Sequence, residues 1–261
     1  MKTLKAFFEI VDIHMVIVIC LSLLLTYLCI HFNLQSDLPS GFVGIAIVFP
    51  VVFSINAAYK RREQALGYFA DFKAHFVSLY YAHRDWIPKT EQNPTIQDFK
   101  NISLKTFTKL HLYLKDEAPE GKDDIAGVYN QFSQLSKLNE KMRVCGVPAN
   151  EVSRANQYLR AIIIDFEKLR NIRLYRTPIA LRAYSRIFLN IFPIIFGPFF
   201  ANLSVKYYPI IGYILAVLYS VVLLSLDHIQ EDLENPFDEI GEDDIKLDVR
   251  EQYETIMNDE L

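Results

Sequence analysis

The chain has 261 residues, of which 51% are hydrophobic, and its formal net charge is −4. It is too long for a mini-domain, and its apolar residues gather in stretches too long for an ordinary soluble protein. Its basic residues do not cluster in the way that nucleic-acid binding requires, so we expect no nucleic acid among its partners.

Four stretches contain no Asp, Glu, Lys or Arg: 13–36, 38–59, 187–205 and 207–226. A helix that rises about 1.5 Å per residue needs roughly 20 such residues to cross about 30 Å of hydrocarbon. The sequence therefore predicts four membrane-spanning helices, with the lipid bilayer as their partner.

The basic residues indicate how these spans are oriented. The connection 32–41 after the first span has no Lys or Arg, whereas Lys60, Arg61 and Arg62 follow the second span directly. The third and fourth spans are joined by a short segment with a single lysine, Lys206. Because basic loops stay on the cytoplasmic side, we expect both termini and the long middle region to be cytoplasmic. This describes a multi-pass integral protein, which would lie in the cell membrane of a prokaryote.

The middle region has helical periodicity throughout, and no segment alternates long enough to indicate a strand. Apolar residues recur at spacings of three and four in 59–87, 95–115, 125–142 and 150–174. We expect an all-α membrane protein in which a cytoplasmic helical bundle extends the spans. The expected divisions are 1–59 with the first two spans, 60–184 as the cytoplasmic domain, 185–229 with the last two spans, and 230–261 as an acidic tail.

No group of residues in the sequence has the pattern of a catalytic or metal site. There is no glycine-rich phosphate loop, nucleophile elbow or paired-cysteine motif, and the three cysteines form no disulfide pattern. His75 and His83 lie two helical turns apart, and we expect packed or solvated roles for both. We therefore expect neither an enzyme nor a bound cofactor or metal.

The C-terminal tail differs in charge from the rest of the chain. Residues 227–261 contain fourteen acidic residues against two basic ones, a net charge of −12. The remaining residues carry an excess of positive charge. We expect the tail either to be solvated or to run along the basic cytoplasmic domain of its own or a neighbouring subunit.

Three bulky apolar residues, Ile45, Phe49 and Phe53, repeat every four positions in the second predicted span. On a helix they form one stripe about 12 Å long. The spacing alone fits packing against lipid or another helix. However, the small residues Gly44 and Ser54 permit close packing on the other faces, so that the large residues can turn to a central axis.

The order of features resembles the bestrophin family of pentameric ion channels, over nearly the whole chain. The matching segments are Asn56 to Arg61 (NAAYKR), Arg176-Thr177-Pro178, Glu234-Asn235-Pro236-Phe237, and Gly241-Glu242-Asp243-Asp244. The chain departs from the family pattern at Arg62 and Glu63, where an aromatic pair is usual, and by the insertion of residues 238–240 between the last two motifs.

The resemblance implies a homopentameric, bestrophin-like chloride or anion channel, with itself and inorganic ions as partners. Ile45, Phe49 and Phe53 would fall on the three pore-lining positions of the family's hydrophobic neck. In animal members the acidic run after the NPF motif binds Ca²⁺, which needs six to eight oxygens. Because the insertion displaces Glu242, Asp243 and Asp244, we expect a metal-free role here. Glu234 would cap or pair locally, and Pro236 would turn the chain.

Two alternatives remain open on the sequence. A membrane-anchored scaffold or interaction protein would use the helical cytoplasmic domain to bind a soluble partner. Within the channel interpretation, a cation-selective pore remains open, because rings of apolar residues do not declare the sign of the ion. The family's second, cytoplasmic constriction is expected in the region 150–164.

Overall fold

The computed structural model describes residues 12–37, 40–88, 95–115, 125–175, 179–240 and 244–258, which form α-helices and connections without strands. The chain divides into two compact units. The first unit combines Met1–Lys60 with Thr177–Glu234, and the second combines Arg61–Arg176 with Asn235–Leu261. The all-α prediction is therefore confirmed for the described residues.

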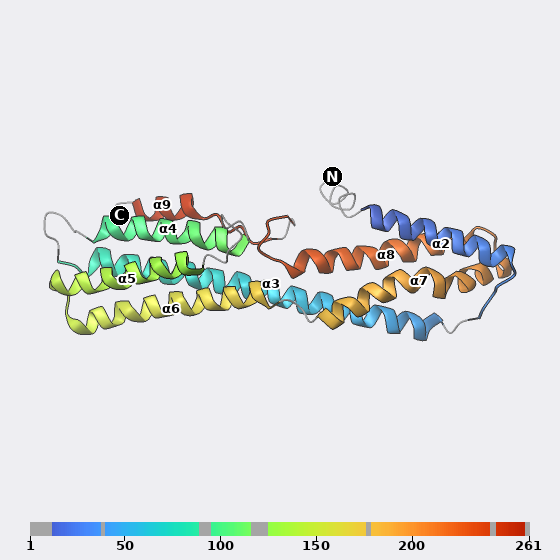
Figure 1. Cartoon of the computed structure of the whole chain (residues 1–261), viewed down its shortest axis with the longest axis horizontal. Helices are drawn as coiled ribbons and strands as arrows, with labels where there is room; N and C mark the ends of the chain where they lie inside the picture. The colour runs from blue at the N-terminus through green and yellow to red at the C-terminus, as the bar shows by residue number, and fades with distance from the viewer. Residues whose placement is uncertain are drawn as a thin grey trace. The chain divides into compact units, whose positions relative to one another are not determined.

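The first unit is built from long apolar helices that pack side by side. These are α2 (Ile13–His31), the beginning of α3 (Ser40–Asp85), α7 (Ile179–Lys206) and α8 (Ile211–Glu234). Each of α2, α7 and α8 contacts the other two (Figure 1). The side chain of Asp12 caps α2 by accepting a hydrogen bond of 2.7 Å from the backbone N–H of Met15, as expected for a residue at this position.

Aromatic packing joins α7 to α8. The buried residues of this cluster are Leu189, Phe192, Phe196, Phe200, Ala216 and Leu223. At the end of the cluster the two helices approach so closely that the backbone N–H of Gly212 donates to Ser204 Oγ at 3.1 Å. A Cβ atom on Gly212 would clash with the carbonyl oxygen of Phe200, so a side chain does not fit at this crossing.

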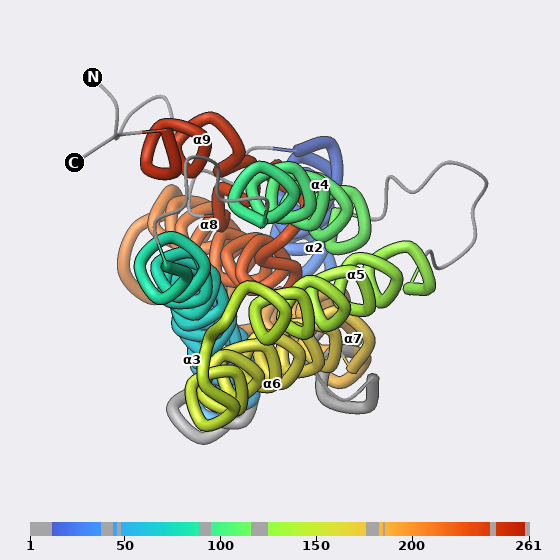
Figure 2. The backbone as a smooth tube through the Cα atoms, turned by 90° about the vertical axis from the view of Figure 1, so that its left-hand side faces the viewer, coloured from blue at the N-terminus to red at the C-terminus, as the bar shows by residue number. Residues whose placement is uncertain are grey.

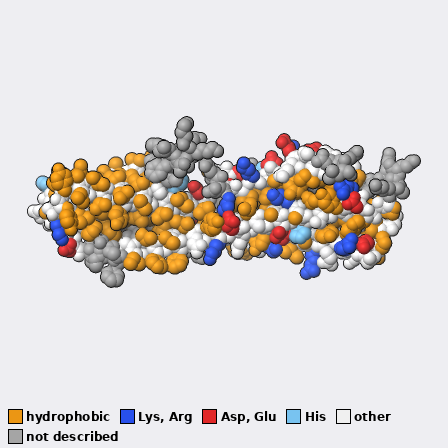
Figure 3. All heavy atoms as spheres, turned by 180° about the vertical axis from the view of Figure 1, so that it is seen from behind, with side chains coloured by type: hydrophobic (Ala, Val, Ile, Leu, Met, Phe, Trp, Pro, Cys, Tyr) orange, Lys and Arg blue, Asp and Glu red, His pale blue; other side chains and the backbone are white. Residues whose placement is uncertain are grey.

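Three helical segments of the described chain are long and apolar enough to cross a membrane: Ile13–His31, Arg186–Lys206 and Ile211–Glu234. The remaining predicted span, 38–59, starts outside the described residues and continues as the first part of α3, so its crossing of the membrane stays a prediction. On the face shown in Figure 3, hydrophobic side chains dominate the first unit, whereas charged side chains are scattered over the second.

The second unit is a helical bundle with an aromatic core. It contains the rest of α3, α4 (Ile96–Lys115), α5 (Ile125–Val144), α6 (Ala149–Leu174) and the short α9 (Arg250–Asn258). Contacts join α4 to α5, α5 to α6, and α9 to α4 (Figure 2). Largely buried phenylalanines fill the core: Phe69, Phe72, Phe76, Phe99, Phe107, Phe132 and Phe166.

The helix that enters this core confirms a prediction from the spacing of aromatic residues. Phe72 and Phe76, one helical turn apart, both pack against Phe107 of α4, with ring centroids 6.1 and 5.1 Å away. The expected continuation of the second predicted span into the helix of residues 59–87 therefore exists as one helix, α3, of 46 residues. Pro50 lies inside it and removes one backbone donor from the helical ladder.

Candidate functional site

The stripe predicted on the second span is an exposed face of α3. Ile45, Phe49 and Phe53 are 56%, 56% and 57% exposed in the single chain. The rings of Phe49 and Phe53 lie against each other with centroids 5.4 Å apart. Three large apolar side chains thus project together from one side of a helix, where water would solvate them poorly.

The opposite side of the same helical segment is packed. Val51, Ser54 and Ala58 are fully buried, which fixes the rotation of α3 about its own axis. Gly44, by contrast, has open space around the position of a Cβ atom, so within one chain it mediates no close packing. The predicted close packing by small residues therefore occurs at Ser54 and not at Gly44.

Asn56 lies one turn beyond Phe53 and is also exposed. Its amide makes no hydrogen bond with the described residues. An amide near the end of an apolar segment needs a polar partner, from water or from another chain. This exposed face of α3 therefore combines large apolar side chains with an exposed amide.

In the region 150–164, where the second constriction is expected, one large apolar side chain points outward. Ile162 is fully buried in the core, Ile163 packs partly against it, and Ile164 is 42% exposed. The sequence does not show which of these three neighbouring isoleucines is exposed, because their exposure depends on the rotation of α6 about its own axis.

The segment after the fourth span forms a structured turn. Phe237 is fully buried in the core of the second unit. Asn235 Nδ2 donates to Asp238 Oδ2 at 2.8 Å, and the carbonyl of Pro236 accepts from the N–H of Ile245 at 3.0 Å. The NPF motif thus anchors the chain through its phenyl ring and turns it at the proline, as the sequence predicts for Pro236.

The inserted residues 238–240 contribute the tail's main charged contact. Glu239 adopts a positive φ of 58° and pairs with Lys115 Nζ at 3.2 Å and with His111 Nε2 at 3.4 Å. It also accepts from the backbone N–H of Leu247 at 3.3 Å. Burial works to raise the pKa of the Glu239 carboxyl, but the hydrogen bonds from Lys115 and Leu247 outweigh it, and the pKa is lowered.

Most of the tail's attachment is apolar, which the sequence analysis did not anticipate. Ile245, Leu247, Val249 and Met257 are buried in the core of the second unit. Tyr80 Oη donates to the carbonyl of Met257 at 2.8 Å, and Lys100 Nζ donates to Asn258 Oδ1 at 3.1 Å. The alternation of apolar residues at 245, 247 and 249 is the signal that could have revealed this attachment.

The remaining residues of the resemblance are only partly described. Glu234 is buried at the end of α8, and Asp244 is half-buried beside Ile245. Glu242 and Asp243, together with Gly241 and residues 176–178, lie outside the described residues. The acidic run as a whole is therefore not placed.

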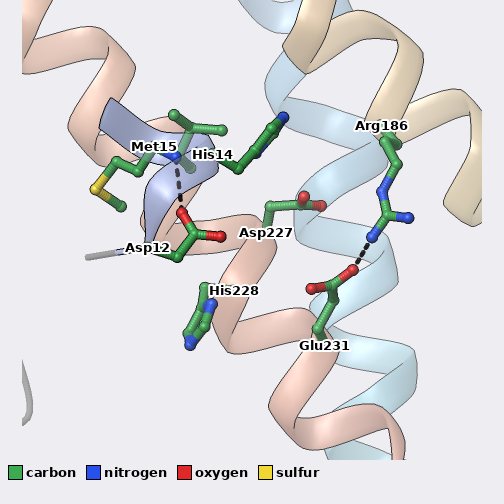
Figure 4. Close-up of a pocket in the computed structure, with 8 residues that line it drawn as sticks. Asp12, His14, Met15, Arg186, Asp227, His228 and Glu231 are labelled. Atoms are coloured by element: carbon green, nitrogen blue, oxygen red, sulfur yellow. Dashed lines mark hydrogen bonds and ion pairs between the residues drawn. The ribbon is translucent and has the colours of Figure 1, made fainter. Parts of the chain in front are cut away.

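The first unit contains a polar pocket of about 270 Å³ that the sequence pattern did not predict (Figure 4). It lies between the beginning of α2, α7 and the end of α8, and Arg186 pairs with Glu231 across it. His14 Nε2 lies 3.0 Å from Asn190 Oδ1 of α7, and Asp12 caps α2. Because these groups bond to one another, the pocket fastens three helices together.

Comparison with known proteins shows which of them share this architecture. No family model matches the sequence, and no curated protein matches it. Among solved structures, a variant of a protein described as a membrane protein has a TM-score of 0.78 and 15% identity, over 94% of this chain and 98% of its own.

Two structures of a bacterial bestrophin homologue from Klebsiella pneumoniae match as well. One has a TM-score of 0.78 and 14% identity over 94% of this chain and 97% of its own. The other, solved by Zn-SAD phasing, has a TM-score of 0.77 and 15% identity over 93% and 96%. The protein is a membrane protein with the fold of these bacterial bestrophin homologues, as the order of its motifs indicated.

Proposed function

We propose that this chain, which has the bestrophin fold, is one subunit of a homopentameric chloride channel whose neck is formed by Ile45, Phe49 and Phe53. The observation that carries the proposal is the exposed stripe on α3, opposite a buried face. A single chain leaves this stripe uncovered, and five copies around an axis would enclose it as three stacked apolar rings.

Such a neck gates by dewetting. When the rings are narrow, water leaves the constriction and ions lose their hydration, whereas a slight widening admits both. Pro50 lies between Phe49 and Phe53 and interrupts the backbone ladder, which makes this part of α3 the place where the helix can bend. In this mechanism the gate needs no bound ligand.

The preference for chloride is proposed from the resemblance to the bestrophin family, because rings of apolar residues do not declare the sign of the ion. The reversal potential across a chloride gradient measures this preference. A reversal potential near the chloride equilibrium value supports the anion channel, and one near the cation value supports the cation alternative.

The topology follows the distribution of basic residues. Both termini and the second unit would be cytoplasmic, and only the two short connections at 32–41 and 203–209 would face outward. Ile164, exposed on α6, is the residue that we assign to the second, cytoplasmic constriction. Replacement of Ile164 with alanine should change ion selectivity or conductance while the subunit count stays the same.

Substitution of the neck tests the proposal directly. Phe49→Ala and Phe53→Ala should each increase single-channel conductance or open probability in planar bilayers, because a smaller ring retains water. Leu24→Ala is the matched control, since Leu24 is 53% exposed on a different helix, α2, and should leave the current unchanged. Unchanged current in both phenylalanine variants, with folded protein, would show that the stripe does not line the pore.

A further inference from the structure

A groove of about 460 Å³ lies in the second unit, and its lining residues include none from the stripe or from the NPF motif. Three helices line it. Leu104, Lys105, Thr108 and Lys109 come from α4, Gln131 from α5, and Arg250 and Glu254 from the tail helix α9. The groove therefore exists only while α9 is docked on α4.

Positive charge predominates in this groove. Lys105, Lys109 and Arg250 face a single acidic residue, Glu254. Lys105 and Lys109 lie one helical turn apart on the same face of α4, so both contribute positive charge to the same wall of the groove. Lys105 and the guanidinium of Arg250 form no ion pair with the described residues, so both are free to take an external partner.

A buried amide gives a second, independent indication of a ligand. Gln131 is only 8% exposed, and its Oε1 atom is buried without a hydrogen-bond partner among the described residues. The amide nitrogen makes no hydrogen bond there either. A phosphate oxygen cannot satisfy Oε1, because both atoms are acceptors, but the N–H groups of the same amide can donate to an anion in the groove. Thr108 does not compete, because its hydroxyl already donates to the carbonyl of Leu104 at 3.0 Å.

We propose that this groove binds the phosphate or pyrophosphate group of a soluble small molecule, and that the bound anion holds α9 against α4. Lysine, arginine and amide N–H groups are the donors that proteins use for phosphate oxygens. None of the helices that line the groove is among the candidate membrane spans, which favours a soluble ligand over a lipid headgroup. The proposal does not depend on the channel function.

The linkage between ligand and tail gives a specific readout. Because Arg250 belongs to α9 and Lys105 to α4, an anion bound to both opposes the release of α9. Hydrogen–deuterium exchange of the full chain in mild detergent should show slower exchange at residues 250–258 when inorganic pyrophosphate is added. Sodium chloride of equal ionic strength should not slow it. An equal effect of both salts would overturn the proposal.

Charge-neutralising variants locate the binding site. Lys105→Gln should weaken pyrophosphate binding by roughly tenfold, as expected for the loss of one charge-assisted contact. Lys137→Gln is the matched control, because Lys137 is exposed on α5 and does not line the groove. It should bind within about twofold of the unmodified protein. Calorimetry measures both, after equal thermal midpoints have shown that both variants fold.

The two possible sources of phosphate are separated by a vesicle assay. If vesicles of phosphatidic acid slow the exchange of α9 in a manner that depends on Lys105 and soluble pyrophosphate does not, the ligand is a lipid and the proposal is wrong. Equal losses of affinity in Lys105→Gln and Lys137→Gln would reduce the effect to nonspecific charge attraction and overturn it as well.

Discussion

At the scale of single residues, His83 is a buried histidine whose two ring nitrogens both have hydrogen-bond partners. It is fully buried on α3, with its ring centroid 4.9 Å from that of Phe99. Its Nε2 lies 2.9 Å from Asn139 Oδ1, and its Nδ1 lies 3.2 Å from Thr95 Oγ1. Nε2 therefore carries the proton and donates to the amide oxygen, while Nδ1 accepts from the hydroxyl.

Burial lowers the pKa of His83 to about 4, although the hydrogen bond to Asn139 works in the opposite direction. In the unfolded chain the pKa is about 6.5, so the unfolded state takes up a proton first as the pH falls. The contribution of His83 to stability is therefore complete above about pH 6.5 and is lost as the pH falls toward 4. By linkage the loss is on the order of 3 kcal/mol.

This loss can be measured as the thermal midpoint of the detergent-solubilised protein between pH 7.5 and 4.5. His83→Gln removes the titrating group, so its midpoint should fall less steeply with pH than that of the unmodified protein. His31→Gln replaces an exposed histidine at the end of α2 and should keep the original slope. An identical slope in His83→Gln would mean that other groups cause the acid sensitivity.

The environment of a residue can be predicted from the sequence only when its contact partners lie close to it along the chain. The sequence predicts that His83 lies on a helix in a packed or solvated role. Its partner Asn139 lies on another helix, α5, and Asn139 in turn donates to Asn156 Oδ1 at 2.8 Å. Nothing in the local pattern of α3 indicates this chain of polar contacts, because it arises only when three helices pack.

At the scale of secondary-structure elements, the crossing of α7 and α8 depends on Gly212. The helices approach until the N–H of Gly212 donates to Ser204 Oγ, and the position of a Cβ atom is occupied by the backbone of Phe200. Because a backbone carbonyl cannot move aside as a flexible side chain can, Gly212→Ala should separate the helices and destabilise the protein by about 1–3 kcal/mol.

Gly197 provides the comparison within the same helix bundle. A Cβ atom there would lie 3.5 Å from Cys29 Sγ and from Leu25 Cβ, which is ordinary van der Waals contact. Gly197→Ala should therefore leave the thermal midpoint nearly unchanged, whereas Gly212→Ala should lower it by several degrees. A midpoint of Gly212→Ala equal to that of Gly197→Ala would show that the crossing adjusts without cost.

The elements themselves were largely predictable, and the tail was not. Helices α4, α5 and α6 follow the apolar spacing, and their ends lie close to the expected positions. The tail helix α9 has nine residues, too few to be stable alone, so its existence depends on docking against α4. In the sequence the buried apolar residues of the tail are isolated among acidic residues, so their apolar pattern does not stand out. These buried residues include Phe237, Ile245 and Met257.

At the scale of the whole molecule, the apolar surface of one chain requires covering. Residues on every helix of the first unit remain more than half exposed, among them Leu24 on α2, Ile194 on α7 and Leu218 on α8. Lipid can cover side chains of this kind. The face of α3 differs, because the exposed amide of Asn56 follows the exposed Phe53, and hydrocarbon cannot satisfy an amide.

In a pentamer, neighbouring copies of α3 would provide apolar contacts for the phenylalanines and polar contacts for Asn56. The number of subunits is therefore the decisive prediction for the assembly. Particles in mild detergent, imaged along the membrane normal, should show five subunits around a central opening with one α3 from each subunit beside it. Native mass spectrometry should give a mass of five chains. A monomer or dimer would instead support the scaffold alternative, because one or two copies cannot enclose an axis with Ile45, Phe49 and Phe53.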